Sequence, residues 1–210
     1  MDAIETFSHN TMAIQIHVDE DPENPRDWDN LGTMVCFHNR YRLGDKHSYK
    51  SAYEFKLWVT EHKEVLADVV ALNLFLMDHS GLVMRTNSDA FKACDSQGWD
   101  WGQVGVIYVT YERIKKEFGS CDAEAIDNAR AALVGEVETY SQYLAGEVYG
   151  YAITDEGGNT IESQWGIYGF ENCKKEAMEA AERSPHSPLA PHVKQHIDDE
   201  KVQAELAFFN

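Results

Sequence analysis

The sequence predicts an α+β protein whose sheet is largely antiparallel and packed by helices. Strand-like alternation at residues 12–18 and 103–111, and helical spacing at 48–66 and 122–144, occur without a regular strand–helix–strand order. The chain has 210 residues and a hydrophobic content of 43%, enough for a sizeable core. We therefore expect a single core domain over residues 1–183.

The first strand is expected at residues 12–18, where apolar residues alternate with Gln15 and His17. Residues 19–30 form an acidic loop containing prolines, and a second apolar strand follows near residues 33–38. This order places the first two strands on either side of a charged connection.

A dense apolar run at residues 68–77 predicts a buried strand, with a short return strand at 82–86. A long loop over residues 87–101 then leads into the central strand at 103–111. We expect this central strand to organise the sheet.

The longest helix is expected to begin after Asp122, a favourable N-cap residue, and to end before Gly146. Residues 148–154 and 160–168 form the clearest hairpin in the chain. A short acidic helix at 171–182 follows, and residues 184–210 are expected to be a proline-led linker and a C-terminal helix.

The formal net charge is −18, from 36 acidic and 18 basic residues, and acids exceed bases in every third of the chain. Such a surface disfavours direct binding of nucleic acid and suits a basic protein partner, although solubility alone is the simpler explanation. No apolar run is long enough to span a membrane, and the N-terminus does not have a signal-peptide pattern. The cysteines form no C-x-x-C pair, so we expect reduced thiols and a cytoplasmic location.

The loop before the central strand contains two tryptophans on either side of Asp100, bracketed by Gly98 and Gly102. It is either a ligand or partner pocket, or a rigid corner in which Asp100 accepts backbone N–H groups and the indoles fill the core. The tyrosines of the hairpin at 148–168 are either a protein-binding face or part of the core against the 122–144 helix. The candidate binding residues are Trp28, Trp99, Asp100, Trp101, Tyr149, Tyr151 and Trp165.

A hydrolase-like site is a further possibility. Asp78 and His79 follow a buried strand and would join Asp100 and Asp29 if these loops converge at one end of the sheet. The alternative is that these side chains only cap loops. The sequence has no phosphate-binding loop, dinucleotide fingerprint or nucleophile elbow, so we expect no cofactor.

Two weaker chemical candidates remain. His192, His196 and Glu200 are spaced for one face of the final helix and are weak metal-ligand candidates, although a solvated face explains them more simply. Cys121 lies beside a predicted helix N-terminus but has no histidine near it in sequence, so a structural or surface thiol is favoured.

A series of motifs rich in tryptophan, glycine and tyrosine runs in order through residues 12–170. The segments are Trp28-Asp29-Asn30-Leu31-Gly32-Thr33-Met34, His79-Ser80-Gly81, Trp99-Asp100, Gly102-Gln103-Val104-Gly105, Ile107-Tyr108-Val109, Glu138-Thr139-Tyr140, Tyr143-Leu144, Gly146-Glu147-Val148-Tyr149-Gly150-Tyr151, Trp165-Gly166 and Tyr168-Gly169. Together they resemble a widespread family of tailed-bacteriophage proteins. The resemblance implies a phage origin but no particular reaction. Trp101 stands where the family pattern has a serine and Gln164 where it has a cysteine, which disfavours a catalytic role for either position.

The acidic charge, the missing catalytic motifs and the phage-like motifs favour an acidic, phage-encoded binding protein. It would inhibit or redirect a basic host factor, such as a nucleic-acid-handling or anti-phage defence protein, by phosphate mimicry or by blocking a surface. Mimicry requires rows of acids spaced about as closely as phosphates. The alternative is a small hydrolase-like enzyme, metal-dependent or not. A third hypothesis is an assembly protein whose final helix pairs with a second copy of the chain.

Overall fold

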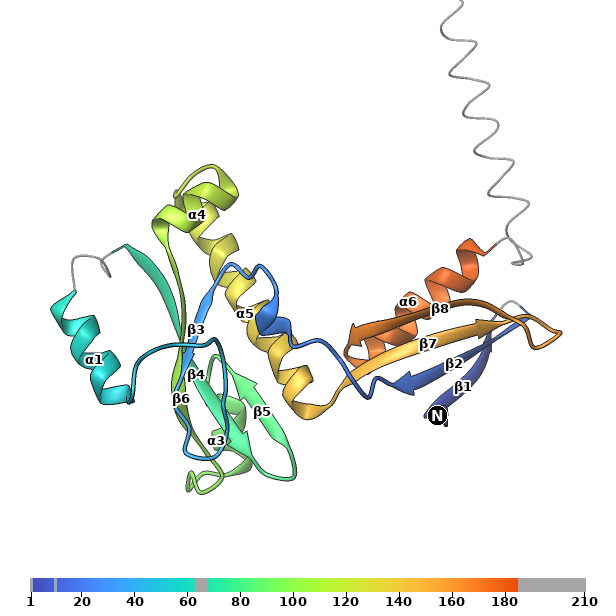
Figure 1. Cartoon of the computed structure of the whole chain (residues 1–210), viewed down its shortest axis with the longest axis horizontal. Coiled ribbons are helices and arrows are strands. Elements are labelled where there is room, and N and C mark those ends of the chain that lie inside the picture. Colours follow the sequence, from blue (N-terminus) through green and yellow to red (C-terminus); the bar gives the residue numbers. More distant parts are fainter. Residues whose placement is uncertain (1, 10, 63–67, 185–210) are drawn as a thin grey trace, which may run out of the picture. The chain divides into compact units, whose positions relative to one another are not determined.

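The computed structural model describes residues 2–9, 11–62 and 68–184. Figure 1 shows two antiparallel sheets with helices, so the α+β class is confirmed. The structure divides the chain into two compact units where the sequence suggested one core. Unit 1 comprises residues 1–22 and 147–210, and unit 2 comprises residues 23–146. In the described ranges, no helix has the length and apolar character needed to cross a membrane.

Unit 1 has a four-stranded sheet in the order β1-β2-β7-β8, antiparallel throughout. The N-terminal strand β2 pairs with β7 of the distant hairpin, with Ile14 opposite Ile153 and Ile16 opposite Tyr151. This long-range pairing separates the N-terminal strands from the unit 2 sheet. The elements are β1 (Glu5–His9), β2 (Met12–Val18), β7 (Val148–Thr154), β8 (Thr160–Tyr168) and α6 (Phe170–Arg183).

One face of the unit 1 sheet packs against α6. The alternation of β2 places its apolar residues on this inner face, and α6 presents small residues that allow close approach. The inner strand residues and the helix therefore share one core. Its buried members are Met12, Ile14, Ile16, Tyr151, Ile153, Ile167, Cys173, Ala177, Ala180 and Ala181.

Unit 2 has a second four-stranded antiparallel sheet, in the order β3-β6-β4-β5, with the expected central strand β6 between β3 and β4. Its strands are β3 (Thr33–Cys36), β4 (Val69–Asp78), β5 (Leu82–Arg85) and β6 (Trp101–Thr110). Its described helices are η1 (Pro25–Asp27), α1 (Ala52–Glu61), α3 (Asp89–Cys94), α4 (Tyr111–Phe118) and α5 (Ala123–Ala145).

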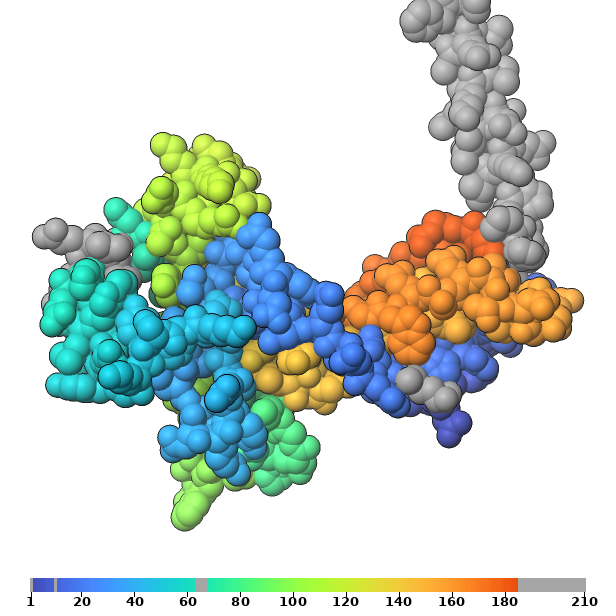
Figure 2. All heavy atoms as spheres, in the orientation of Figure 1, coloured from blue at the N-terminus to red at the C-terminus, as the bar shows by residue number. Residues whose placement is uncertain are grey.

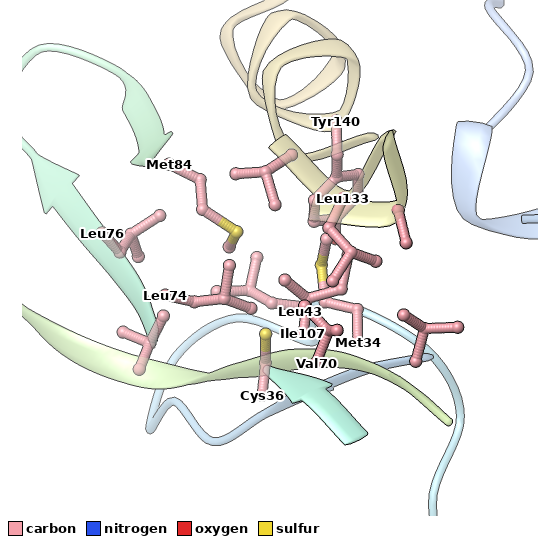
Figure 3. Packing of buried hydrophobic residues seen from close by; sticks show 14 of the residues in the cluster. Met34, Cys36, Leu43, Val70, Leu74, Leu76, Met84, Ile107, Leu133 and Tyr140 are labelled. Carbon is pink, nitrogen blue, oxygen red and sulfur yellow. The ribbon is translucent and has the colours of Figure 1, made fainter. Parts of the chain in front are cut away.

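Helix α5 covers one face of the unit 2 sheet and has both expected ends. The Asp122 carboxylate accepts the Ala125 N–H at 2.9 Å, and Gly146 ends the helix in the left-handed conformation with φ of 71°. Figure 3 shows Leu133 and Tyr140 of α5 above Leu74 and Ile107 of the sheet. The buried stripe of α5 consists of Ala125, Ala129, Leu133, Val137 and Tyr140.

Several elements differ from the sequence prediction, either in length or because no element was predicted there. Helix α1 is shorter than residues 48–66, and none of its residues is buried, because its apolar side chains meet little of the sheet. Strand β1 and helices α3 and α4 were not predicted, since each is short. Helix α4 nevertheless has an amphipathic pattern, with Tyr111, Ile114 and Phe118 at helical spacing. The final helix expected after Pro191 lies outside the described residues.

Candidate functional site

Three of the four predicted catalytic residues meet at one end of the unit 2 sheet. Because β4 and β6 are antiparallel, the end of β4 lies beside the loop that enters β6. The Asp78 N–H donates to the Asp100 carbonyl oxygen at 2.8 Å. The His79 Nδ1 atom lies 2.8 Å from Asp100 Oδ2 and shares a hydrogen bond with it. The convergence that a hydrolase-like site would require is therefore present for Asp78, His79 and Asp100.

The Asp78 carboxylate is held by two residues that the sequence did not single out. Arg40 forms an ion pair with it, and the Tyr41 hydroxyl donates to its Oδ2 atom at 3.2 Å. Asp78, Asp100, Trp99 and Trp101 line an open hollow of about 330 Å³ together with residues 37–40. No motif marks Arg40 or Tyr41, because they belong to a long connection whose path depends on the tertiary fold.

The chemistry available to this cluster is limited. The His79 and Asp100 side chains are 70% and 45% exposed, so water screens their interaction. Within the described ranges, the only side-chain hydrogen bond of His79 is to Asp100, so no serine, threonine or cysteine is positioned as a nucleophile. The pair can orient an imidazole for proton transfer, and no side-chain nucleophile among the described residues is hydrogen-bonded to it.

Asp29 and Trp28 do not join this cluster. They precede β3, which begins opposite Tyr108 near the end of β6, whereas Asp100 stands before the start of β6. Asp29 therefore lies at the other end of the sheet, where its carboxylate accepts from Arg113 Nη2 at 3.1 Å. The four-residue catalytic constellation expected from the sequence is reduced to three residues for this topological reason.

Asp95 organises the Trp-Asp loop in the way suggested for Asp100. Its carboxylate accepts the backbone N–H groups of Gln97, Gly98, Trp99 and Asp100 at 2.6–3.2 Å. The Asp100 N–H, together with the other three, lowers the pKa of Asp95. An aspartate followed three residues later by glycine is a turn signal, so Asp95 was detectable in the sequence.

The two indoles of this loop have different environments. The Trp101 Nε1 donates to the Asp95 carbonyl oxygen at 2.8 Å, and its ring lies 6.3 Å from those of Phe75 and Phe91, measured between ring centroids. Trp99 is 82% exposed. The loop is thus a rigid corner with one indole that packs and one that remains available for contact.

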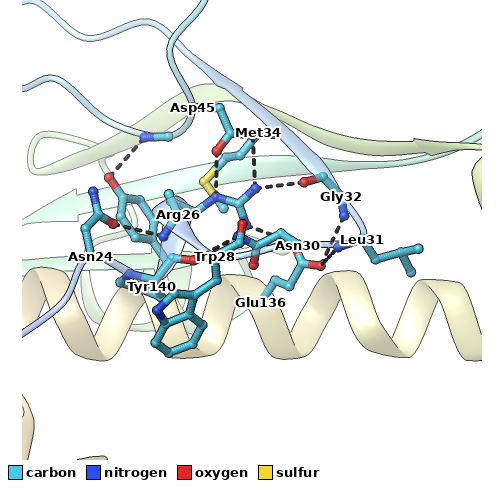
Figure 4. Close-up of polar contacts among 12 residues, drawn as sticks. Asn24, Arg26, Trp28, Asn30, Leu31, Gly32, Met34, Asp45, Glu136 and Tyr140 are labelled. Atoms are coloured by element: carbon cyan, nitrogen blue, oxygen red, sulfur yellow. Dashed lines mark hydrogen bonds and ion pairs between the residues drawn. The ribbon is translucent and has the colours of Figure 1, made fainter. Parts of the chain in front are cut away.

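The Trp-Asp-Asn-Leu-Gly turn of the resembling motifs is held by a buried ion network (Figure 4). The Arg26 guanidinium, whose side chain is 3% exposed, pairs with Asp45 and with Glu136 of α5, each at 2.8 Å. Its Nη2 also donates to the Gly32 carbonyl at 2.7 Å, while Glu136 accepts the Leu31 N–H at 2.7 Å. The turn is therefore fixed onto α5, and the motif has a structural role in unit 2.

Two glycines of the same motifs allow close packing. A Cβ atom on Gly105 would lie 2.1 Å from the Val35 carbonyl oxygen of the neighbouring strand. A Cβ on Gly32 would lie 2.3 Å from Leu133 Cδ2 of α5. Gly102 has no such neighbour within 4 Å, so close packing accounts for Gly105 and Gly32 but not for Gly102.

The tyrosine face of the hairpin in unit 1 is part of the core. Tyr151 is 1% exposed, and the Tyr149 ring packs edge-on against Phe170 at a centroid distance of 5.5 Å. These tyrosines therefore pack with α6, not with the 122–144 helix, and Tyr151 is too buried for a binding surface. Trp165 lies on the outer face beside Gly150 and His17 and is 46% exposed, which leaves it available for contact.

No group of three or more His, Cys, Asp or Glu side chains in the described ranges is placed to hold a metal ion. His192, His196 and Glu200 lie outside these ranges. Burial raises the pKa of the Cys36 thiol to about 12 and that of Cys173 to about 11, so both are poor nucleophiles. Cys121 is partly exposed and packs against the unit 2 core.

Acidic side chains are distributed unequally between the units. The described residues of unit 1 include thirteen Asp and Glu against three Lys and Arg, whereas those of unit 2 include eighteen against twelve. The three described bases of unit 1 are all on α6, and each is ion-paired, Lys174 with Glu5 and both Lys175 and Arg183 with Glu179. The strands and loops in the described part of unit 1 therefore carry acidic side chains and no Lys or Arg.

No family model, curated protein or solved structure matches the chain.

Proposed function

We propose that the chain is a phage-encoded binding protein that uses the acidic surface of unit 1 to contact a basic protein in the host cytoplasm. The observation that carries this proposal is that every Lys and Arg in the described part of unit 1 is ion-paired and lies on α6. Charge of one sign over strands and loops attracts a surface of the opposite sign and speeds encounter with it. A partner that normally binds nucleic acid has such a surface, so contact would inhibit or redirect it.

The acids at one end of the unit 1 sheet are the best-defined part of this surface. Asp19 fixes the local backbone, because its carboxylate accepts the Asp21 N–H at 3.1 Å and the Gly166 N–H at 3.0 Å. Glu20, Asp21 and Glu147 are exposed nearby, since β2 ends where β7 begins. Their carboxylates can meet lysine and arginine side chains of a partner without rearrangement of the loop.

The test is capture of host proteins on the tagged full-length chain, after nuclease treatment and with stepwise salt elution. The test variant Glu20→Gln/Asp21→Asn/Glu147→Gln removes exposed charge from unit 1 and leaves Asp19 in place. The control Glu112→Gln/Glu117→Gln/Asp127→Asn removes the same charge from exposed positions of unit 2. We expect one basic protein to be retained by the wild type and the control, to elute as salt rises, and to be lost by the test variant. Equal retention by both variants would contradict the proposal.

The second candidate function is a hydrolase-like activity, favoured by the hydrogen bond between His79 and Asp100. Asp100 would orient the imidazole and His79 would carry a proton. A screen of phosphoester and carboxylic ester substrates, with and without divalent metals, would test it. Activity that falls at least about a hundredfold in Asp100→Asn, a typical loss for a general acid–base group, would support this candidate. Activity unchanged by that substitution would exclude the cluster as its source.

A further inference from the structure

Unit 2 contains a hollow whose charge is opposite to that of the chain as a whole. It measures about 830 Å³, and nearly all of its lining comes from residues 36–52, which connect β3 to α1. Figure 2 shows this connection, in light blue and cyan, on the surface of unit 2. We propose that this hollow binds a free nucleoside phosphate, with the phosphates on Arg42, Lys46 and Lys50 and the base against the aromatic rings.

Three cationic side chains give the hollow a positive charge. Arg42, Lys46 and Lys50 are exposed side chains that line the hollow, and none of them has an ion-pair partner among the described residues. They are unusual in a chain where acids outnumber bases two to one, 36 to 18. Unpaired cations gathered around one hollow provide the charge that phosphate groups need.

The one carboxylate in the lining does not cancel this charge. Asp45 accepts from Arg26 Nε at 2.8 Å and Nη2 at 3.0 Å, and from the Met34 N–H at 2.7 Å. Its carboxylate is therefore engaged by the buried guanidinium of Arg26, which Glu136 shares. The lining still has three exposed cations against this one carboxylate.

The start of α1 is closed by its own side chains. Ser51 and Ala52 line the hollow, and Ser51 Oγ accepts the Glu54 N–H at 3.1 Å as the helix cap. The Glu54 carboxylate in turn accepts the Lys50 N–H at 2.6 Å. The positive charge of the hollow therefore comes from the three cationic side chains and not from the helix end.

Aromatic rings supply a surface for a planar base. His38 and Tyr41 are stacked, with centroids 5.0 Å apart and an interplanar angle of 17°, and both line the hollow. Tyr49 lines the same space and packs edge-on against Phe55 at 4.9 Å. Stacking on aromatic side chains is a common means of holding nucleobases. The combination of cations and rings selects an organic phosphate with a planar ring over inorganic phosphate.

The connection is fixed at its middle, so the backbone that carries these side chains is held before any ligand arrives. The Gly44 N–H donates to the Tyr140 hydroxyl at 3.0 Å, and the Asp45 N–H donates to the Met34 carbonyl at 2.8 Å. His47 Nε2 lies 2.9 Å from the Cys36 carbonyl oxygen, within hydrogen-bond distance. A backbone anchored in this way reduces the ordering cost of binding. A free ligand is favoured over a nucleic-acid polymer, because the net charge of −18 repels a long phosphate backbone.

The test is calorimetric titration of the full-length chain with ATP at low salt, alongside tripolyphosphate, adenosine and a single-stranded oligonucleotide. We expect ATP to bind with a dissociation constant below about 100 µM, and tripolyphosphate or adenosine alone to bind at least about tenfold more weakly. No ATP binding at about millimolar concentration would overturn the proposal. Tripolyphosphate binding as tightly as ATP would overturn the assignment of the rings, and an oligonucleotide binding in preference to ATP would overturn the assignment of a free ligand.

Two matched variants distinguish binding in the hollow from a general effect of positive charge on ATP affinity. Arg42→Gln/Lys46→Gln/Lys50→Gln should weaken ATP binding at least about tenfold, since each lost cation removes a charge-assisted contact. Arg85→Gln/Lys115→Gln/Lys116→Gln removes three exposed, unpaired cations elsewhere in unit 2 and should leave the affinity unchanged. Equal weakening in both variants would overturn the proposal, and thermal melting of each checks that it is folded. Because unit 1 takes no part, the result is independent of the proposed partner.

Discussion

The two units use acidic side chains in different ways. In unit 2 the carboxylates of Asp45 and Glu136 are bound to a buried arginine, and those of Asp95 and Asp122 accept backbone N–H groups. In the described part of unit 1, Glu5 pairs with Lys174 of α6, and the strands and loops themselves carry no Lys or Arg. The net charge alone conceals this difference. Several acids of unit 2 hold its turns and helix, whereas exposed acids of unit 1 are available to a partner.

This contrast has a consequence for mutagenesis. Removing a partner from the buried network of unit 2 leaves charges that are costly to bury, so stability falls. Removing exposed acids from unit 1 relieves repulsion between like charges, so stability is kept while binding is lost. Stability and binding measurements should therefore separate the units.

The largest expected effect is that of Arg26→Met. The substitution leaves Asp45 and Glu136 without their cation in a buried setting, and we expect the free energy of unfolding to fall by about 3–5 kcal/mol. Arg113→Met breaks the pair with Asp29, whose side chain is 92% exposed, and should cost less than about 1 kcal/mol. Urea unfolding of both variants provides the measurement. Equal losses would mean that the buried network has no special structural role.

The next effect concerns the close approach of β3 to β6. In Gly105→Ala the new Cβ meets the Val35 carbonyl oxygen, which must move, so we expect a loss of about 2–3 kcal/mol. Gly102→Ala on the same strand places its Cβ in open space and should change stability by less than about 0.5 kcal/mol. Thermal unfolding of the pair tests this, and a Gly105→Ala variant as stable as Gly102→Ala would contradict the packing described.

A smaller effect is the response of the unit 1 core to alkali. Burial, aided by the charge of Glu162, raises the pKa of Tyr151 to about 12 from an ordinary value of 10.0. The folded state therefore keeps the phenol neutral after it would ionise in the unfolded chain. Below pH 10 the phenol is neutral in both states, and the free energy of unfolding keeps its full value. As the pH rises from 10 through 12, ionisation in the unfolded chain lowers the free energy of unfolding, by about 1 kcal/mol at roughly pH 11.

Tyr151→Phe removes the titrating group and should flatten this part of the stability–pH profile. Chemical unfolding of the wild type and the variant at several pH values between about 9 and 12 measures the difference, which reports Tyr151 alone. A steep decline that is identical in both proteins would assign the alkaline sensitivity to other groups, such as the buried thiols.

The smallest effect on stability is expected for Glu20→Gln/Asp21→Asn/Glu147→Gln. These exposed side chains are surrounded by acids, so neutralising them should change the free energy of unfolding by less than about 0.5 kcal/mol. Any change should be a gain that is larger at low salt. Urea unfolding at two salt concentrations tests this, and a loss above about 1 kcal/mol would show that these acids are structural.

Local patterns predicted the elements whose ends have their own chemical signals. The alternation of residues 12–18 matches β2, Asp122 and Gly146 enclose α5, and the hairpin strands match β7 and β8. The pairing of β2 with β7 was not predictable, because periodicity shows that a strand has a buried face but not which strand lies beside it. The division into two units follows from that pairing.

Part of the candidate site was also predictable from local sequence, and part of it depends on strand pairing. The antiparallel pairing of β4 with β6 brings Asp78, His79 and Asp100 together. Asp29 lies at the other end of the sheet because β3 runs antiparallel to β6, and the sequence does not show this strand direction. Asp95 had a turn signature of its own, whereas the partnership of Arg26 with Glu136 joins positions far apart in sequence with no local sign. The cationic hollow was also hidden, because its residues gather only when the connection from β3 to α1 folds.

The most direct test of the central claim measures stability and partner binding on the same two charge-neutralised variants. For the unit 1 variant, Glu20→Gln/Asp21→Asn/Glu147→Gln, we expect wild-type stability and loss of the captured basic protein. For the unit 2 control, Glu112→Gln/Glu117→Gln/Asp127→Asn, we expect wild-type stability and retained binding. Binding that survives in the unit 1 variant, or is lost equally in both variants, would contradict the claim that unit 1 is the binding surface.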